Sequence, residues 1–418
     1  MQHALAGLPD DRLRRLPFNV RFWDGSELQS RDAEPDPPTI YVRDERALSH
    51  LLHEPNQLGL ARAWVSGALD VDDLEHALAL RHRFDGLHVN ALSRLRLGLE
   101  ALRIAGPKLL RRPPPPAIEA ERVGGMRHSI ARDRSSVRHH YDVSNDFYRL
   151  LLGPTMVYSC AYFESMDDSL EAAQERKLEL ICRKLRLEPG ERLLDIGCGW
   201  GSLIMHAAAH HGVQAVGVTV SEPQARLARD RIDAAGLSGQ VTVRVADYRE
   251  IDDGPYDKIA SVGMYEHVGR AELPNYARTV RALLRPGGLF LNHGIARLRS
   301  EQPDGDTFIS RYIFPDGELH PITQLLSALQ ACGFEARDLE SLREHYPLTL
   351  RRWLANLEDH RQTVLEQVGA ARERAWRLYI QASAQAFQEG EITVFQVLAA
   401  RDGAPHRLPL AQRRAICV

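Results

Sequence analysis

The chain has 418 residues, more than one ordinary hydrophobic core requires, so its length indicates two or three domains. With 44% hydrophobic residues, 26% charged residues and a net charge of -3, the composition is that of a globular protein and gives no whole-chain sign of nucleic-acid binding. The start lacks an apolar run of signal-peptide length, and no run of about 18 apolar residues occurs elsewhere. We therefore expect a cytoplasmic protein that spans no membrane.

Residues 1–105 predict a small α+β domain. The segments "VRFWDGSEL" and "TIYVRD" have the pattern of short strands, with a DG turn in the first, and residues 45–105 have helical periodicity. Residues 106–122 are expected to be a linker, because four successive prolines exclude helix and strand and favour a stiff extended segment. A domain boundary is expected there, and residues 123–418 are expected to form the second domain.

The end of the first domain carries a basic amphipathic pattern. Leucines recur at helical spacing, and the basic residues among them are Arg94, Arg96, Arg103, Lys108, Arg111 and Arg112. Such a helix can rest on an anionic lipid surface. A packed helix with solvated arginines is the more common explanation, and the sequence leaves both open.

In the second domain, residues 123–180 are expected to be mostly helical and to form a cap. Strands and helices then alternate, and the expected strands are "ERLLDIG", "QAVGVTV", "VTVRVAD", "YDKIASVGM" and "GGLFLNHGI". These strands are rich in Val, Ile and Leu, and helical patterns lie between most of them. This order predicts an α/β fold with a doubly wound, mostly parallel sheet.

The stretch "LLDIGCGWG" places Gly197, Gly199 and Gly201 on the turn after the first of these strands, with Asp195 just before them. In an open α/β sheet this turn makes the closest backbone approach to a ligand, and glycine leaves room for it. The GxGxG spacing is one residue tighter than the GxGxxG dinucleotide fingerprint. It looks like the first motif of methyltransferases that depend on S-adenosylmethionine (SAM), although a glycine turn alone is a weak signal.

Polar residues after the next two strands are further candidates for cofactor binding. The second strand ends at Thr219, followed by Glu222 and Gln224, and lacks the acidic residue that usually binds a ribose hydroxyl. This lack disfavours a nicotinamide-dependent oxidoreductase. The third strand is followed by Asp247 and Tyr248, which can bind and flank an adenine, although Asp247 can also simply cap a turn.

Several stretches in fixed order carry a closer resemblance: "HHYDVSNDFYRLLLGPTMVYSCAYF", "LLDIGCGWG", "GVTVSEPQ", "SVGMYEHVG", "NHGI", "YIFPDGELHP" and "HYPLTLRRW". Together they resemble the cyclopropane-fatty-acyl-phospholipid synthases and the related mycolic acid cyclopropane synthases, a superfamily of Rossmann-like SAM-dependent methyltransferases. The resemblance runs from about residue 130 to the C-terminus. An N-terminal domain of this size also occurs in the phospholipid-acting members, so the resemblance implies phospholipid acyl chains as substrate.

The resemblance implies transfer of a methylene group from SAM to a cis double bond of an unsaturated acyl chain. An alkene needs no protein nucleophile, only alignment with the sulfonium methyl in a dry pocket. Ring closure then needs a base, which in the family is a bound bicarbonate. The positions that match its binding set are Cys160, Glu266, His293, Ile295 through its backbone, and Tyr346.

Some of these residues are also candidates by their place in the chain. Glu266 and His293 are expected to follow the fourth and fifth strands, at the sheet edge where ligand-binding groups converge. Taken singly, each has an ordinary explanation as a helix cap or a hydrogen-bonded core residue. Cys160 is expected to be a weak hydrogen-bond donor, because no neighbouring charge in the sequence lowers its pKa. Tyr158 and Ser159 match cofactor-contacting positions.

His206, His210 and His211 in "HAAAHH" have a spacing that is compatible with metal binding. Their place at a helix C-terminus explains them by dipole compensation, and no acidic residue lies at ligand spacing within the motif, so no metal site is expected. The five cysteines are scattered and are expected to be reduced thiols. His267 is expected to point away from the site, because neighbours on a strand face opposite sides.

The outcome of the reaction and the partners rest on the resemblance alone. "NHGI" departs from the family's usual "LHTI" and leaves Asn292 and Gly294 beside His293. Near relatives form a methyl or methylene branch without a ring, but they tend to have serine where this chain has Cys160. An inactive lipid-binding protein and a methyltransferase for a small molecule are further alternatives. We also expect peripheral contact with the inner face of the membrane, a homodimer and no nucleic-acid partner.

Overall fold

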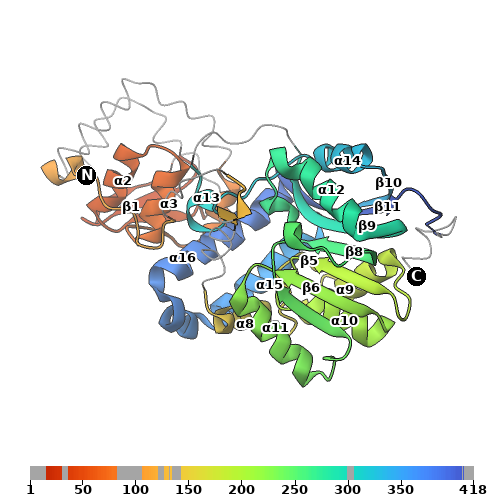
Figure 1. The fold of residues 1–418 in the computed structure, drawn as a ribbon. Coiled ribbons are helices and arrows are strands. Elements are labelled where there is room, and N and C mark those ends of the chain that lie inside the picture. Colours follow the sequence, from red (N-terminus) through yellow and green to blue (C-terminus); the bar gives the residue numbers. More distant parts are fainter. Residues whose placement is uncertain are drawn as a thin grey trace. The chain divides into compact units, whose positions relative to one another are not determined.

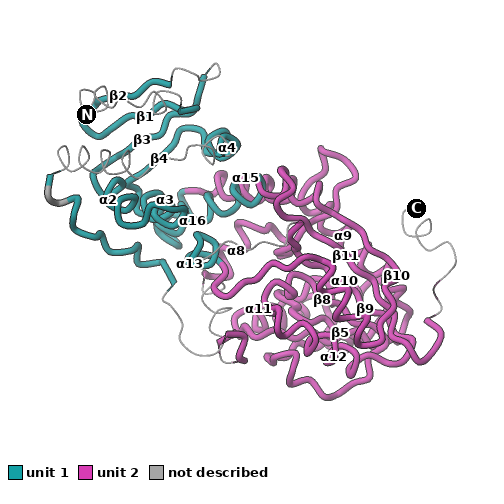
Figure 2. Tube along the Cα trace, turned by 90° about the horizontal axis from the view of Figure 1, so that it is seen from above, with its two compact units in different colours: residues 1–121, 303–313, 362–385 teal, residues 122–302, 314–361, 386–418 magenta. Residues whose placement is uncertain are grey.

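The computed structural model describes residues 16–30, 36–81, 106–120, 127–130, 132–133, 143–298, 306–406 and 408 (Figure 1). The chain divides into two compact units, which Figure 2 colours separately. Unit 1 comprises residues 1–121, 303–313 and 362–385, and unit 2 comprises residues 122–302, 314–361 and 386–418. Among the described residues, no helix is long and apolar enough to cross a membrane.

Unit 1 contains a four-stranded sheet with the strand order β2-β1-β3-β4, in which only β1 and β3 run parallel. Its strands are β1 (Asn19–Phe22), β2 (Glu27–Leu28), β3 (Thr39–Val42) and β4 (Leu69–Val71). Its helices are α2 (Glu45–His53), α3 (Gln57–Val65), α4 (Leu74–Ala79), the 3-10 helix η2 (Pro107–Leu110), α13 (Phe308–Tyr312) and most of α16 (Arg361–Gln388). The smaller α+β unit is therefore confirmed, with β4 as a strand that the sequence pattern missed.

Buried ion pairs hold the separate segments of unit 1 together. The carboxylate of Glu119 accepts hydrogen bonds from Arg62 at 2.8 and 2.7 Å, from Arg311 at 2.9 Å and from the Tyr312 hydroxyl at 2.8 Å. Trp64 donates to the carbonyl of Arg374, whose guanidinium lies 4.1 Å from the indole centroid. Residues 303–313 and 362–385 therefore belong to unit 1, although the sequence patterns assigned them to one continuous domain, 123–418.

The proline-rich segment has neither helix nor strand at its four prolines, as expected, but it is packed rather than free. The Ser49 hydroxyl contacts the carbonyls of Leu109 and Arg111 at 3.1 and 3.0 Å, and Glu119 lies in the buried cluster described above. Residues 106–120 therefore form part of unit 1. The boundary between the units along the chain falls after residue 121, close to the end of the expected linker.

Unit 2 is built on a seven-stranded sheet with the order β10-β11-β9-β8-β5-β6-β7. Strands β5 to β9 are parallel, β11 pairs antiparallel with β9, and β10 pairs antiparallel with β11 and so runs in the direction of the parallel strands. The strands are β5 (Arg192–Ile196), β6 (Gln214–Thr219), β7 (Val241–Val245), β8 (Tyr256–Val262), β9 (Leu284–Arg297), β10 (Phe334–Ser341) and β11 (Ile392–Arg401). The predicted doubly wound, mostly parallel α/β fold is confirmed.

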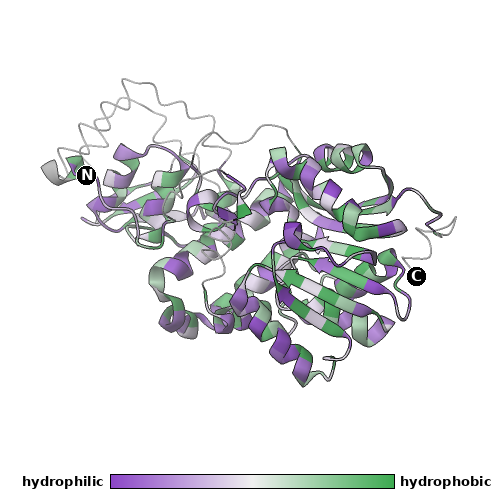
Figure 3. Cartoon of the chain, viewed as in Figure 1, coloured by the Kyte–Doolittle hydropathy of each residue, from purple (hydrophilic) through white to green (hydrophobic). Residues whose placement is uncertain are grey.

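Helices cover both faces of this sheet. One face packs against apolar residues of α9, α10 and α11, and the other against α12 and α14. The described helices of unit 2 are α8 (Asn145–Leu152), α9 (Leu170–Leu185), α10 (Ser202–His211), α11 (Glu222–Ala234), α12 (Leu273–Leu283), α14 (Ile322–Ala331) and α15 (His345–Asp359). The central strands β5, β8 and β9 are almost wholly buried, and Figure 3 shows hydrophobic residues along the strands of this sheet.

The cap preceding the sheet is less helical than the sequence predicts. α8 and α9 are present, but residues 153–169 between them form no helix. Gly153 ends α8 at a φ of 70°, and Pro154 follows it. This non-helical segment carries Tyr158, Ser159 and Cys160. It is held in place by the Gln174 side chain, which donates to the Ser159 carbonyl at 2.9 Å.

Candidate active site

The glycine turn lies where the strand order reverses, between β5 and its two neighbours β6 and β8. The φ angles of Gly197, Gly199 and Gly201 are 84°, 54° and 84°, a region that favours glycine. A Cβ at Gly197 would lie 3.2 Å from the Cβ of Met264. The loop therefore requires glycine for its backbone conformation and for its close packing.

A cavity opens at the carboxyl ends of the parallel strands, entirely within unit 2. Nearly all the predicted cofactor residues line it: Tyr158, Ser159, Asp195, Gly197, Gly199, Thr219, Gln224, Asp247 and Tyr248. The exception is Gly201, which begins α10 and whose added Cβ would meet Ala228 at 3.3 Å. Residues at the ends of three strands, β5, β6 and β7, and from the cap thus converge on one cavity. Gly201 serves helix packing.

Two buried groups of opposite charge face this cavity. Asp195 is 2% exposed, and its Oδ1 has no hydrogen-bond partner among the described residues. Lys177 is 1% exposed and donates to the Ser159 hydroxyl at 2.9 Å. Burial raises the pKa of Asp195 to about 7, against the opposing charge of Lys177, and burial lowers the pKa of Lys177 to about 8. The pair can receive a zwitterionic ligand, with the ammonium at Asp195 and the carboxylate at Lys177.

The opposite side of the cavity combines an aromatic ring with a fixed polar network. Tyr248 is buried, and the Arg249 guanidinium lies 5.4 Å from its ring centroid. Arg249 donates to both oxygens of Asp247 at 2.7 Å and to Asp133 at 2.8 Å. Thr219 donates to the Gln224 side chain at 2.8 Å. Asp247 also caps the 3-10 helix η3 (Tyr248–Glu250), so its capping role and its place on the cavity coexist.

A second polar group lies at the ends of β8 and β9. Glu266 is in the 3-10 helix η4 (Tyr265–His267), and its Oε1 accepts from the backbone N–H of Ile295 at 2.7 Å. Its other oxygen, Oε2, is buried without a hydrogen-bond partner among the described residues. Burial raises the pKa of Glu266 to about 7, although the hydrogen bond from Ile295 opposes the shift. One oxygen is therefore fixed and the other is available to a ligand.

His293 lies two residues before Ile295 on β9, on the same face of the strand. The Gln396 side-chain amide donates to its Nδ1 at 3.1 Å, which leaves the proton on Nε2. Nε2 is buried and has no partner among the described residues. Burial lowers the pKa of His293 far below its usual value, so the ring is neutral and offers one N–H donor.

The segments that carry Cys160 and Tyr346 are linked to β9 indirectly, through backbone contacts with β11. The Cys160 thiol, fully buried, contacts the Leu342 carbonyl at 3.7 Å, and Leu342 donates to Val394, which pairs with Ile295. Tyr346 follows one turn later and its ring lies 4.4 Å from that of Phe387. Burial raises the pKa of Cys160, so the group is a thiol and a weak donor, as expected. The roles of these residues stay predictions.

The two departures from the family motif face away from the free nitrogen of His293. Asn292 is buried and donates to the Tyr276 hydroxyl at 3.1 Å. Gly294 lies under Tyr265, and a Cβ there would approach the ring at 2.8 Å. A glycine at this position thus allows Tyr265, the neighbour of Glu266, to pack against β9.

Several cavity residues were missed by the sequence patterns, among them Lys177, Trp200, Met264 and Arg249. The prediction for His267 was wrong: this residue lines the cavity, while Glu266 turns toward Ile295. β8 ends at Val262, so the two residues lie in a 3-10 turn, where strand alternation does not apply.

Other expectations fall outside the described residues. Arg94, Arg96, Arg103 and Cys417 are among these positions. Arg112 is described, and it pairs with Glu54 at 3.1 Å.

The sheet, the glycine turn and a cavity with an unpaired carboxylate define a SAM-dependent methyltransferase of the Rossmann-like class. Residues 128–397 match the mycolic acid cyclopropane synthetase family, and the chain belongs to this family. It is 38% identical to a probable fatty acid methyltransferase from Mycobacterium tuberculosis, over 92% of this chain and 91% of that protein. It is 33% identical to the cyclopropane-fatty-acyl-phospholipid synthase of Escherichia coli, over 94% of this chain and 95% of that protein.

A solved structure agrees with this assignment. The mycolic acid cyclopropane synthase CmaA1 complexed with SAH and CTAB is 33% identical, with a TM-score of 0.61, and the match covers 64% of this chain and 98% of that chain. SAH is the demethylated product of SAM. The glycine turn and the charged pair Asp195 and Lys177 fit such a ligand, which carries an ammonium and a carboxylate.

Proposed function

We propose that the protein transfers a methylene group from SAM to the cis double bond of an unsaturated fatty acyl chain in phospholipid and forms a cyclopropane ring. The observation that carries this proposal is the pair of unpartnered buried atoms, Oε2 of Glu266 and Nε2 of His293, at the end of the sheet that bears the cofactor cavity. Such groups are available to bind a base, which ring closure requires and simple methyl transfer to a heteroatom does not.

The chain's own residues would act by binding and orientation. SAM supplies the electrophilic methyl when bound, and Asp195 and Lys177 would fix its amino-acid end. Bicarbonate, which the family implies as the base, would fit between the N–H donor of His293 and the free oxygen of Glu266, and would accept the proton lost on ring closure. The carboxylate of Glu266 also stabilises positive charge that develops nearby. Ile295 holds this carboxylate in place through its N–H.

A branched product is the alternative. It is favoured by the 38% identity to a probable fatty acid methyltransferase, whose name does not specify a ring. In this case the cation formed by methyl transfer would lose a different proton and give an alkene, whose double bond a separate reductase with a hydride donor could then reduce. Both products require loss of a proton to a base, so the unpaired atoms of Glu266 and His293 suit either one. The ring is favoured by Cys160, because branch-forming relatives tend to have serine at this position.

The experiment is an assay of the purified full-length protein with SAM and vesicles of a cis-monounsaturated phospholipid. We expect each modified acyl chain to gain the mass of one CH2, to lose its alkene proton signals and to gain those of a ring in NMR spectra. A gain of mass with retained alkene signals would establish the branched product instead. An unchanged lipid would reject both forms of the proposal.

We further propose that the protein binds the membrane surface peripherally, because an acyl chain must reach a buried cavity from the bilayer. The resemblance to the family is the ground for a second proposal, that the protein acts as a homodimer. The basic pattern around residues 91–112 is the candidate contact. The full-length protein should bind anionic phospholipid vesicles more tightly than neutral ones, and salt should weaken this binding. Binding that is indifferent to both lipid charge and salt would contradict electrostatic docking.

A further inference from the structure

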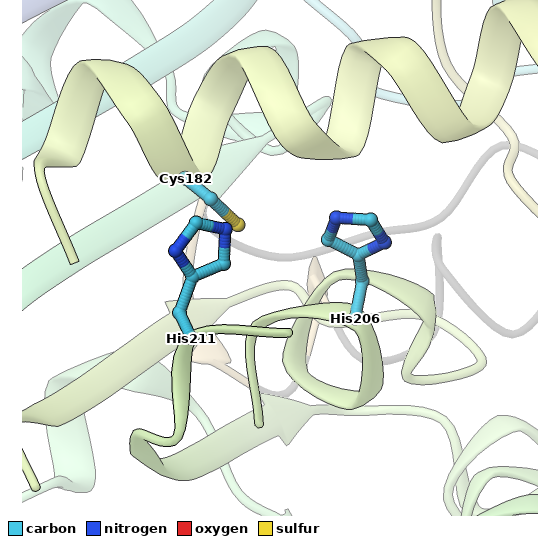
Figure 4. A group of neighbouring side chains, drawn as sticks. All are labelled: Cys182, His206 and His211. Carbon is cyan, nitrogen blue, oxygen red and sulfur yellow. The ribbon is translucent and has the colours of Figure 1, made fainter. Parts of the chain in front are cut away.

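A cluster of metal-ligand side chains lies on α9 and α10, and its members are not among the residues lining the cofactor cavity. Cys182 extends from α9 toward His206 and His211 of α10 (Figure 4). One ligand atom from each of these residues lies within 4.8 Å of the other two. Cys182 is fully buried, and the two histidine side chains are 15% and 18% exposed. The group is therefore sheltered and yet accessible from solvent on the histidine side.

A carboxylate adjoins the same cluster. Oε2 of Glu179 lies 3.1 Å from Nε2 of His206 and 3.0 Å from Nε2 of His211. Its other oxygen, Oε1, accepts from Arg183 at 2.7 Å, which fixes the orientation of the carboxylate. Glu179 and Cys182 are three residues apart on α9 and thus share one helix face.

We propose that Cys182, His206, His211 and Glu179 bind a divalent cation of the zinc class. Thiolate, imidazole and carboxylate are the ligands that Zn²⁺ takes in tetrahedral sites, whereas Ca²⁺ and Mg²⁺ require oxygen ligands. A thiolate and a carboxylate together neutralise the two positive charges of the cation. Binding replaces the Cys182 thiol proton and moves the histidine protons from Nε2 to Nδ1, so one proton per cation passes to solvent.

The role of this site would be structural. α9 and α10 lie on the same face of the sheet, and other residues of both helices, such as Lys177 and Leu203, line the cofactor cavity. A cation shared by the two helices would tie their C-terminal halves together. None of its four members lines the cofactor cavity, so the proposed site does not take part in the transfer chemistry.

The competing explanation is a hydrogen-bonded cluster in which Glu179 accepts from both histidines. In this case the dipole of α10 favours positive charge near the C-terminal end of the helix. In this explanation Cys182 is only a member of the apolar core on this face of the sheet, and its thiol has no polar role. The thiol therefore separates the two ideas, because a hydrogen-bonded cluster without metal does not need it.

The test uses the full-length protein, freed of metal by a chelator and titrated with Zn²⁺ or Co²⁺. We expect one cation per chain, a Co²⁺–thiolate charge-transfer band, and a rise in the thermal unfolding temperature with Zn²⁺. Cys182→Ser and His206→Gln should each weaken Zn²⁺ binding at least about 100-fold, since even changes to groups around metal ligands cost about 10- to 100-fold. His206 is partly exposed, with 15% of its side chain accessible, so its variant keeps the test valid where the fully buried Cys182 variant fails to fold.

Matched controls are available elsewhere in unit 2. Cys332→Ser removes a thiol, and His360→Gln removes an exposed histidine, and neither residue belongs to the cluster. Both variants should bind Zn²⁺ like the unchanged protein. The proposal is overturned if the unchanged protein shows no Co²⁺–thiolate band, or if His206→Gln and His360→Gln bind Zn²⁺ equally well.

Discussion

Replacing Glu266 by Gln should lower the turnover number at least about 100-fold, within the range that a positioned acid–base group contributes. The amide can still accept the N–H of Ile295, so the fold should persist. The substitution does remove the negative charge that would stabilise the cation, and it removes the free carboxylate oxygen that would hold the base. The measurement is the rate of alkene loss in phospholipid vesicles at saturating SAM.

The matched control for this change is Glu175→Gln on the exposed face of α9, which should leave turnover unchanged. Binding of SAH, measured by calorimetry, should stay within about twofold in both variants, because Glu266 does not line the cofactor cavity. A Glu266→Gln protein with near-normal turnover would show that the carboxylate is only a structural partner of β9.

The raised pKa of Glu266 sets the expected pH dependence of the reaction. Burial raises the pKa of Glu266 to about 7, and the proposed role requires the ionised form. Activity should therefore fall as the pH drops through about 7, by about tenfold per unit, and level off above it. Asp195 titrates in the same range, and its contribution is read from the pH dependence of SAH affinity, which an Asp195→Asn variant should lose.

Replacing Gly199 by Leu should weaken SAH binding at least about 100-fold, which equals about 2.7 kcal/mol. An added Cβ at Gly199 meets no protein atom within 4 Å, and the residue lines the cavity. The side chain would therefore occupy ligand space. The measurement is calorimetric titration with SAH.

Gly190→Leu provides a control for the cost of the backbone conformation. Gly190 also has a positive φ, 83°, and open space around its Cβ, but it lies on the exposed turn before β5. Both variants should lose similar thermal stability, and only Gly199→Leu should lose SAH affinity. Equal affinities in the two variants would contradict the assignment of the cofactor to this turn.

The parallel core of the fold was predictable from the sequence because each central strand is buried on both faces and so is a continuous apolar run. β10 was missed for the opposite reason: it is an edge strand with mostly exposed residues, and its segment "FEARDLES" has no such run. β4 is only three residues long and lies among helices.

Cavity residues at the carboxyl ends of strands, such as Asp195 and Asp247, were predictable, because ligands of an open α/β sheet bind at this edge. Lys177 was missed, although a signal existed: it lies at heptad spacing from Lys184 on the buried face of α9, where lysine is rare without a partner. The cluster on α9 and α10 was missed because its ligands come from two separate segments. No spacing rule within "HAAAHH" reveals Glu179 and Cys182.

The discontinuous composition of unit 1 bears on how this protein can be shortened. A fragment that starts after residue 121 would keep Arg311 and Tyr312 but lose the buried carboxylate of Glu119, and would keep Arg374 but lose the indole of Trp64. A cut after residue 121 therefore removes the partners of two segments that return much later in the chain. Evolution or engineering of a smaller enzyme from this architecture must remodel residues 303–313 and 362–385 together with the deletion.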